Sequence, residues 1–346
     1  VLSAVRSRGV SPIVIDDTGR RDWQSLGAVA VLPAELDLVG LCSLLDAHAA
    51  RVTTEPVGPR LAADASFRGS LVAVLGVRGC GTSTIAAATA QGLARRPDGR
   101  GSVLLADFAL ESCLGLYHDA PDVVPALPEL VEAHRAGRPD RDAVQRMTFE
   151  VERRGYALLL GLRRSTDWSA MPPAATTAAS ESLRATWRWV VADCSPELDG
   201  EAETGSIDVE ERHQLARLAV SEAATVLAVG DPSARGLRHL VRVLDEAAGR
   251  GVPAERLVPV VNRSPRSPAE RARLARTLAS LAADAVVRSP VFVPERRGVE
   301  LAHRAVSPLP EAVVRPLQAA VRLGDRLPVP AASVTRPEPE RVAVRT

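Results

Sequence analysis

The sequence predicts an α/β protein built around a doubly wound, mostly parallel β-sheet. From residue 71 onward, short runs that are apolar at every position recur along the chain, as expected for strands buried on both faces of a parallel sheet. These runs alternate with helical or polar stretches, which is the pattern of βαβ connections. A glycine-rich turn follows the first run and opens a helix, the usual place of a phosphate-binding loop in such sheets.

The strands of this sheet are expected where the unbroken apolar runs lie. These runs are 71–75, 103–106, 156–160, 189–192, 226–229, 257–261 and 291–293. Two of the helices between them have recognisable starts. Ser267 followed by Pro268 predicts a helix that continues to residue 281. Asp208 with Glu211 forms a capping box that predicts a helix over 212–223.

A shorter α/β segment is expected before this domain. Residues 11–50 read as strand, loop, strand and helix, and Asp16 with Asp17 is expected to form a turn after the first strand. Residues 51–69 carry proline and glycine and few periodic apolar positions, which is typical of a linker. The predicted organisation is an α/β segment over 1–50, a linker over 51–69, the sheet domain over 70–326 and a proline-rich, disordered tail over 327–346.

The composition is that of an ordinary globular protein. Hydrophobic residues make up 46% and charged residues 25% of the 346 positions, and the net charge is +1. All 43 basic residues are arginine, and the charge balance does not indicate a nucleic acid or a membrane as partner. The four cysteines form no C-x-x-C pair, which argues against a zinc site or a disulfide framework and fits a reducing cytoplasm. No apolar run reaches the length of a transmembrane helix.

A phosphate-binding loop is predicted at residues 76–84. The spacing from Gly76 to Gly81 matches G-x-x-x-x-G, after which a P-loop carries lysine and then serine or threonine. Here those two positions are Thr82 and Ser83, so a Mg²⁺ ligand is retained but the charge that reaches the β- and γ-phosphates is missing. Arg78 is the one basic side chain in the loop. The residues predicted to hold phosphate are Gly76, Arg78, Gly79, Cys80, Gly81, Thr82, Ser83 and Thr84.

Two strand ends carry an aspartate that such a site needs. Asp193 ends the 189–192 strand and is predicted to hold Mg²⁺ together with Ser83. Asp107 ends the 103–106 strand and is the candidate for positioning the attacking water. Asn262 follows the 257–261 strand, and its amide offers both a donor and an acceptor to the edge of a base.

Two other interpretations of the loop stay open on these residues. The turn could join a strand to a helix without binding any ligand. It could also belong to an NAD-binding Rossmann enzyme, because residues 79–84 approach G-x-G-x-x-G and Asp107 ends the second strand. Thr84 stands where the third glycine of that fingerprint belongs.

Over residues 70–326 the chain resembles the ParA/MinD superfamily of P-loop ATPases. The family's loop reads K-G-G-x-G-K-[ST]-[ST], and here Val77 and Thr82 replace its two lysines. Asp107 opens a D-x-D strand end whose second aspartate is Ala109, and Asp193 with the next three residues looks like the Walker B strand and its switch. Asn262-Arg263 is similar to the adenine-binding N-R pair, and Pro294 to the proline loop beside the base.

Within this superfamily the loop looks most like that of the actinobacterial CpaE-like branch, related to TadZ, in which the lysine is also missing. Members of that branch carry a receiver-like module before the ATPase domain, and residues 1–50 resemble only its last portion, so the module is expected to be truncated.

The resemblance implies an ATP- and Mg²⁺-binding protein of the cytoplasm that forms a homodimer on nucleotide. It would act as a spatial regulator or scaffold, recruited to the pole, septum or membrane periphery by protein partners of a pilus, secretion or division apparatus. Without the lysines, nucleotide binding is expected to survive with weak or absent hydrolysis. A partner-binding pseudo-ATPase that binds no nucleotide stays an alternative. DNA is not an expected partner, although five arginines lie near one helix start: Arg263, Arg266, Arg271, Arg273 and Arg276.

Overall fold

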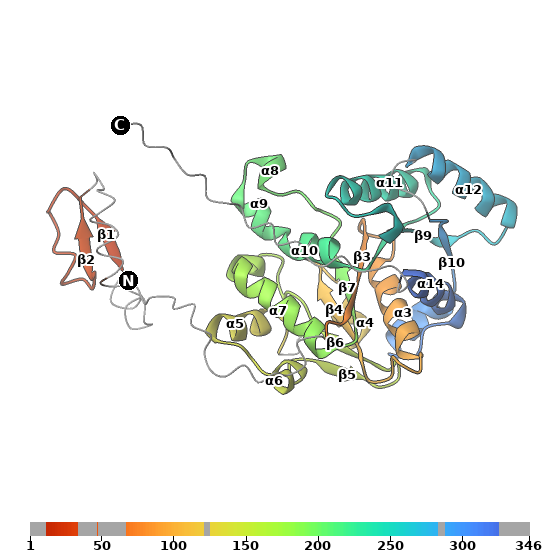
Figure 1. Ribbon diagram of the computed structural model, residues 1–346, viewed down its shortest axis with the longest axis horizontal. Helices are drawn as coiled ribbons and strands as arrows, with labels where there is room; N and C mark the ends of the chain where they lie inside the picture. Colours follow the sequence, from red (N-terminus) through yellow and green to blue (C-terminus); the bar gives the residue numbers. More distant parts are fainter. Residues whose placement is uncertain (1–11, 34–46, 48–66, 121–124, 283–287, 325–346) are drawn as a thin grey trace. The chain divides into compact units, whose positions relative to one another are not determined.

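Figure 1 shows the computed structural model of the chain, which describes residues 12–33, 47, 67–120, 125–282 and 288–324. The chain divides into two compact units, residues 1–65 and residues 66–346. Apart from residue 47, the part of 11–50 that follows residue 33 and includes the predicted helix lies outside the described residues, as do the predicted linker up to residue 66 and the predicted tail from 327.

In the first unit, two short strands form where the sequence predicts them. β1 (Ile13–Ile15) pairs in parallel with β2 (Ala30–Leu32). Asp16 then forms a turn: its carboxylate accepts hydrogen bonds from the Thr18 backbone N–H at 2.8 Å and from the Trp23 indole at 2.6 Å. The Thr18 hydroxyl also donates to this carboxylate at 2.6 Å, and this bond, followed by those from Trp23 and the Thr18 N–H, holds the pKa of Asp16 below its usual value.

The second unit contains the predicted parallel sheet. Among the described residues its eight strands lie in the order β10-β9-β8-β3-β7-β4-β6-β5, and every neighbouring pair is parallel except β5 with β6. The strands are β3 (Ser70–Gly76), β4 (Val103–Phe108), β5 (Phe149–Val151), β6 (Tyr156–Leu159), β7 (Trp189–Cys194), β8 (Thr225–Gly230), β9 (Leu257–Ser264) and β10 (Val291–Pro294). The α/β fold class predicted from the apolar runs is therefore confirmed.

Helices cover both faces of the sheet (Figure 1). One apolar core lies against α5 (Leu127–Ala136), α7 (Pro173–Thr186), α10 (Gln214–Glu222), α11 (Ala234–Gly249) and α12 (Pro268–Leu281). The other lies against α3 (Thr82–Ala94), α13 (Gly298–Arg304) and α14 (Glu311–Gly324). Along β3, Leu71, Ala73 and Leu75 face the first core, whereas Val72 and Val74 face the second. Residues 71–75 of this strand are all apolar, as expected where both faces of a strand are buried.

The remaining helices are short and lie in the connections. They are α4 (Leu114–Tyr117), α6 (Arg141–Gln145), α8 (Glu201–Thr204) and α9 (Ile207–Arg212), with the 3-10 turns η1 (Asp167–Ala170) and η2 (Ala254–Arg256). None of the helices that the structure describes has both the length and the apolar character needed to cross a membrane.

Two local predictions have different outcomes. The α12 start is confirmed, since the Ser267 hydroxyl accepts from the backbone N–H of Glu270 at 3.4 Å. The capping box at Asp208 is wrong: α9 begins at Ile207, ends at Arg212, and is followed by a separate α10. Asp208 lies instead in the first turn of α9, where a negative side chain faces the positive end of the helix dipole.

The strand order brings the predicted site residues to one edge of the sheet. β3 lies between β7 and β8, so the loop that follows Gly76 emerges between the ends of β7 and β8. Asp107 on β4 and Asp193 on β7 are direct cross-strand partners. The carboxyl edge of an open parallel sheet is the place where such folds bind ligands, and the chain folds so that its glycine-rich loop and its two aspartates meet there.

Candidate functional site

The loop after β3 has a backbone that glycine makes possible. Gly79 and Gly81 have φ of 88° and 89°, in the left-handed region that side chains disfavour. A side chain could not be accommodated at Gly76, because an added Cβ atom would lie 2.7 Å from the Cys80 sulfur, the Thr82 hydroxyl and the Val229 carbonyl. The loop therefore closes tightly on itself before α3 begins at Thr82, and the N–H groups at that helix start have no partner within the helix.

Asn262 and Arg263 hold this loop from the end of β9. The Asn262 amide donates to the Cys80 carbonyl at 2.8 Å, and its oxygen accepts from the Arg263 N–H at 2.9 Å. The Arg263 guanidinium donates to the Gly79 carbonyl at 3.0 Å. Asn262, only 8% exposed, thus braces the loop from beneath; its predicted contact with a base remains a prediction.

The three hydroxyls at the start of α3 have different surroundings. Thr82 donates to the Gly76 carbonyl at 3.2 Å, so its hydroxyl is turned back onto the loop. The Thr84 hydroxyl lies 3.1 Å from Nε2 of His303, a buried ring that stacks on Tyr117 with 3.8 Å between ring centroids. The Ser83 hydroxyl lies next to Asp193 and partly offsets the rise in the pKa of that carboxyl that burial causes. Ser83 is therefore the hydroxyl best placed to share a cation with a carboxylate.

A cavity of ≈ 490 Å³ opens over the loop. It brings together most of the residues that the sequence predicts for phosphate and Mg²⁺. Those lining it are Gly76, Arg78, Gly79, Gly81, Thr82, Ser83, Thr84, Asp193 and Arg263. Four predicted residues do not line it: Cys80, Asp107, Asn262 and Pro294. Cys80 is buried beneath the loop, Pro294 ends β10, and Asp107 lies beside Asp193 within the sheet.

The two aspartates form a buried acidic pair. Asp107 is 3% exposed and Asp193 2% exposed. Burial raises the pKa of Asp107 to about 7, and burial together with the charge of Asp107 raises the pKa of Asp193 to about 8. Oδ2 of Asp193 is buried with no hydrogen-bond partner among the described residues. A buried carboxylate oxygen without a partner is unfavourable unless a cation or a donor meets it.

These residues fit Mg²⁺, which proteins commonly hold through one or two oxygen ligands, substrate phosphates and water. Ser83 and Asp193 supply two such oxygens beside the phosphate loop. In the part of the chain that the structure describes, no cluster of three or more His, Cys, Asp or Glu side chains could hold a metal ion by itself. A divalent ion at this site would accordingly depend on the phosphates of a ligand.

The cationic side chains at the cavity come from three segments. Arg78 of the loop is highly exposed and forms an ion pair with Glu111. Arg212, at the end of α9, and Arg263, at the end of β9, also line the cavity. Arg212, Glu111 and Tyr117 belong to no phosphate-binding motif, and packing of separate segments brings them here, so the sequence alone could not assign them to the site.

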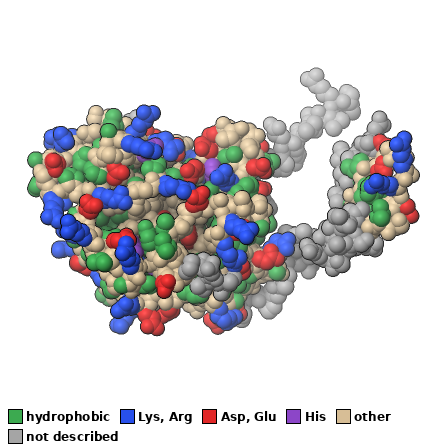
Figure 2. Space-filling model, turned by 180° about the vertical axis from the view of Figure 1, so that it is seen from behind, with side chains coloured by type: hydrophobic (Ala, Val, Ile, Leu, Met, Phe, Trp, Pro, Cys, Tyr) green, Lys and Arg blue, Asp and Glu red, His purple; other side chains and the backbone are tan. Residues whose placement is uncertain are grey.

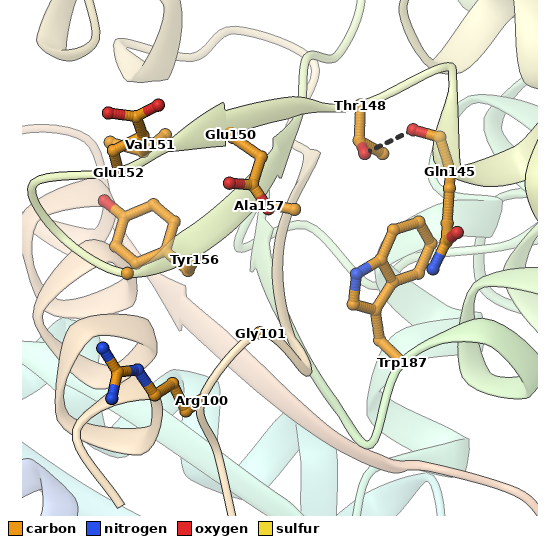
Figure 3. Close-up of a pocket in the computed structure, with 11 residues that line it drawn as sticks. Arg100, Gly101, Gln145, Thr148, Glu150, Val151, Glu152, Tyr156, Ala157 and Trp187 are labelled. Atoms are coloured by element: carbon orange, nitrogen blue, oxygen red, sulfur yellow. Dashed lines mark hydrogen bonds between the residues drawn. The ribbon is translucent and has the colours of Figure 1, made fainter.

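A second cavity lies at the opposite edge of the sheet. It measures ≈ 560 Å³ and is lined by residues that include Gly101, Tyr156 and Trp187, at or near the amino ends of β4, β6 and β7. Figure 3 shows the rings of Tyr156 and Trp187 at its two sides, with Glu150 and Ala157 between them. Doubly wound sheets bind their ligands at the carboxyl edge, so we assign the candidate site to the phosphate loop.

Solved structures of ParA and MinD ATPases share this fold. A ParA family ATPase from Chlorobium tepidum TLS superposes with a TM-score of 0.56 at 16% identity, covering 75% of this chain and all of that one (100%). MinD of Aquifex aeolicus, in a MinC:MinD complex, gives 0.53 at 17% identity, covering 75% and 98%. The septum site-determining protein MinD of Pyrococcus horikoshii OT3, complexed with Mg-ADP, gives 0.52 at 15% identity, covering 74% and 95%.

The sequence itself has no matching family model and no significant match among curated proteins. At identities of 15% to 17%, the structural likeness establishes a common fold, whereas function depends on the site residues. The chain therefore has the P-loop NTPase fold of the MinD and ParA ATPases.

Proposed function

We propose that the protein binds ATP with Mg²⁺ at the carboxyl edge of its sheet and acts as a MinD/ParA-like spatial regulator or scaffold. The main support for nucleotide binding is that the glycine loop, Ser83 and Asp193 line one cavity. One carboxylate oxygen of Asp193 has no hydrogen-bond partner among the described residues. Backbone N–H groups of the loop and of the α3 N-terminus would bind phosphate oxygens. Ser83 and Asp193 would hold Mg²⁺, which neutralises phosphate charge when bound.

ATP hydrolysis is proposed to be weak or absent. Thr82 has no charge, and its hydroxyl is bonded to the loop's own Gly76 carbonyl. Arg78 is exposed and paired with Glu111 rather than directed at the loop centre. Asp107 does not line the cavity, so its predicted role in positioning water would require a rearrangement of this edge. Arg212 and Arg263 are the cations that we propose to neutralise bound phosphate.

The cellular role is proposed from the fold and the lysine-less loop. Among the proteins of this fold, one MinD structure contains MinC and another contains Mg-ADP. We propose by analogy a homodimer on nucleotide and a protein partner in a division, pilus or secretion apparatus, with residues 1–50 as a truncated receiver-like segment of a CpaE-like protein. The pseudo-ATPase alternative, in which the fold binds a partner but no nucleotide, is favoured by the internal bonding of Thr82 and Asn262.

A titration of the full chain with a fluorescent ATP analogue tests the proposal. With Mg²⁺ present, we expect saturable binding that ATP displaces and NAD does not. Asp193→Ala should weaken this binding at least tenfold, because it removes the proposed Mg²⁺ ligand. Asp199→Ala, in the connection after β7 and outside the cavity lining, is the matched control. Absence of binding at millimolar nucleotide would leave the pseudo-ATPase alternative, and displacement by NAD would favour the Rossmann enzyme.

A further inference from the structure

We infer that His303 is a positioning residue of the phosphate site, which holds the Thr84 hydroxyl so that its hydrogen points into the cavity and donates to a phosphate oxygen. The inference rests on the proposed nucleotide site, and it adds His303 and the Tyr117 ring that holds it to that site. Its basis is a contact between the start of α3 and the end of α13, two segments far apart in the sequence.

The Thr84 hydroxyl lies between the cavity and a buried imidazole. Thr84 is half-buried and lines the cavity over the loop, and its hydroxyl oxygen lies 3.1 Å from Nε2 of His303. His303 is 5% exposed and does not line the cavity. A ligand in the cavity would therefore meet Thr84, whereas His303 can act on that ligand only through the hydroxyl.

The position of one proton on the His303 ring decides what Thr84 offers to a ligand. Burial lowers the pKa of His303 to about 4, and the nearby Arg154 charge adds to this effect, so the ring is neutral at pH 7 and carries a single N–H. With the proton on Nδ1, the Thr84 hydroxyl donates to Nε2, and the cavity meets only the hydroxyl oxygen. With the proton on Nε2, the ring donates to the Thr84 oxygen, and the hydroxyl hydrogen is left for a ligand.

The other ring nitrogen, Nδ1 of His303, favours the proton on Nε2. Nδ1 is buried and has no hydrogen-bond partner among the described residues. A proton on Nδ1 would leave a buried N–H without an acceptor, whereas a proton on Nε2 leaves only a lone pair without a donor. Among buried backbone groups, an N–H without a partner is the rarer of these two defects. The ring therefore donates to Thr84, and the Thr84 hydroxyl is a donor toward the cavity.

Tyr117 holds the imidazole in place and also faces the ligand site. Its ring stacks on that of His303, with 3.8 Å between the ring centroids and 18° between the ring planes. Tyr117 lines the cavity. Burial raises the pKa of Tyr117, and a hydrogen bond from the neighbouring Thr84 hydroxyl partly offsets this rise. In the free protein the Tyr117 oxygen can accept the Thr84 hydrogen, but a charged phosphate oxygen is the stronger acceptor.

The backbone that carries His303 is fixed on both sides of the ring. The Arg154 guanidinium donates to the carbonyl of Ala302 at 2.9 Å and to that of Ser307 at 3.0 Å. Between them, Val306 has φ of 45°, a conformation that is rare for a β-branched residue and persists only where the surrounding structure imposes it. His303 therefore cannot easily turn away from Thr84, as a positioning role requires.

Oriented donors matter at this site because the molecule has no general excess of positive charge. The net charge is +1, and Figure 2 shows arginine and acidic side chains intermingled over one face of the molecule. Thr82, where a lysine usually reaches the phosphates, is neutral and bonded to the Gly76 carbonyl. A correctly oriented Thr84 hydroxyl therefore supplies a larger share of phosphate binding here than in a loop that has its lysine.

The tautomer of His303 can be measured in the free protein. Long-range proton–nitrogen correlation spectra of the full chain with isotope-labelled histidine distinguish a ring protonated on Nε2 from one protonated on Nδ1. His303→Gln identifies the His303 signals among those of the six histidines. We expect the Nε2–H form at pH 7. The Nδ1–H form would overturn the inference, because Thr84 would then donate to the ring instead of the cavity.

Isothermal titration of the full chain with MgATP shows whether the contact serves the ligand. His303→Leu and Thr84→Val should each weaken binding about tenfold, because a charge-assisted hydrogen bond to phosphate strengthens binding by about that factor. The double variant should bind as weakly as Thr84→Val alone, since His303 acts only through Thr84. His303→Gln, whose amide can place an N–H near the position of Nε2, should retain the wild-type affinity within about threefold.

His134→Leu is the matched control for the loss of an imidazole. The His134 ring of α5 lies 3.0 Å from the Ser182 hydroxyl of α7, which is the same kind of contact outside the cavity lining. This variant should bind MgATP as the wild type does.

The outcomes separate the two proposals. Losses that add in the double variant, or an equal loss in His134→Leu, overturn the inference and leave the proposed function standing. The tautomer and the His303→Gln variant decide the inference even where His303→Leu does not fold. Absence of MgATP binding in the wild type overturns the proposed function, and the inference with it.

Discussion

Thr82 shows how one side chain changes the chemistry expected of a phosphate loop. It stands where such loops usually carry lysine, and its hydroxyl donates to the Gly76 carbonyl at 3.2 Å. The loop is thereby closed by a neutral hydrogen bond at the position from which a cation would reach the phosphates. Transition-state stabilisation by such a charge is typically worth several kcal/mol.

Thr82→Lys is expected to raise ATP turnover. The lysine places a positive charge at the loop while losing one hydrogen bond worth about 1 kcal/mol of stability. We expect at least a tenfold rise in the rate of phosphate release, measured with purified protein and MgATP. Thr82→Met is the matched control, since it also loses the hydroxyl and adds a straight chain but carries no charge. An equal rate in both variants would contradict the role assigned to the charge.

Asp193→Asn is expected to stabilise the protein without ligand at pH 8. The folded-state pKa of Asp193 is raised from 3.8 to about 8, so the stability linked to its proton is complete below pH 3.8 and is lost as the pH rises through 8. An amide of the same shape removes this loss of stability, which is on the order of 5 kcal/mol at pH 8. Urea unfolding should show the variant more stable at pH 8, with the difference shrinking toward pH 5.

The same substitution should weaken nucleotide binding, because an amide is a poorer Mg²⁺ ligand than a carboxylate. Asp199→Asn, outside the cavity lining, should change neither property. A variant that is less stable than the wild type at pH 8 would show that the carboxylate is already compensated in the free protein.

At the scale of elements, a buried arginine ties the β5–β6 hairpin to the segment around α13. Arg154 is 2% exposed, and its guanidinium donates to the carbonyls of Ala302 at 2.9 Å and Ser307 at 3.0 Å. It also lies 3.2 Å from His118, whose pKa burial and the nearby Arg154 charge lower to about 4. The neutral His118 in turn lies 2.7 Å from the Tyr156 hydroxyl, so α4, the hairpin and α13 share one polar cluster.

Arg154→Ala is expected to destabilise the protein by about 3 kcal/mol, because it leaves buried carbonyls and the His118–Tyr156 pair without their donor. The melting temperature should fall by roughly 6–12 °C for a domain of this size. Arg153→Ala is the matched control: Arg153 is exposed and donates to one carbonyl, that of Ala305, at 3.2 Å. Equal melting temperatures in the two variants would contradict the role of the buried cluster.

The elements differ in how far the sequence could predict them. β3, β4 and β7 to β9 each contain a run of consecutive apolar residues, since both of their faces are buried, and this pattern is visible in the sequence. β5 is a three-residue antiparallel strand at the sheet edge, Phe149–Val151, too short for any periodic signal. At the break between α9 and α10, the His213 ring lies 3.0 Å from the Asp199 carbonyl, a contact that no local pattern reveals.

The residues of the candidate site also differ in how far the sequence could predict them. Glycine spacing and the strand-end aspartates predicted the loop, Ser83 and Asp193, which do line one cavity. The brace formed by Asn262 and the burial of Asp107 depend on which strands become neighbours. Arg212 belongs to no motif, because arginine is common throughout this chain and only packing brings this one to the cavity.

At the scale of the whole molecule, ligand binding should be visible as thermal stability. A ligand that binds only the folded state at 100 times its dissociation constant stabilises that state by about 2.7 kcal/mol. For the proposed ATP site this predicts a rise in melting temperature of roughly 5–10 °C with MgATP. Asp193→Ala should abolish most of the rise, and ATP with EDTA should give less than MgATP. An equal rise with and without Mg²⁺ would contradict the proposed metal ligands.

The central position of β3 in the sheet also limits when the phosphate loop can form during synthesis of the chain. Leu71 pairs with Val190 and Val72 with Thr225, while the loop is braced by Asn262. The glycine loop is therefore synthesised long before the strands that flank it and the amide that holds it. A nascent chain that ends before Asn262 lacks this brace of the loop. Binding at the proposed nucleotide site would therefore require a nearly complete domain.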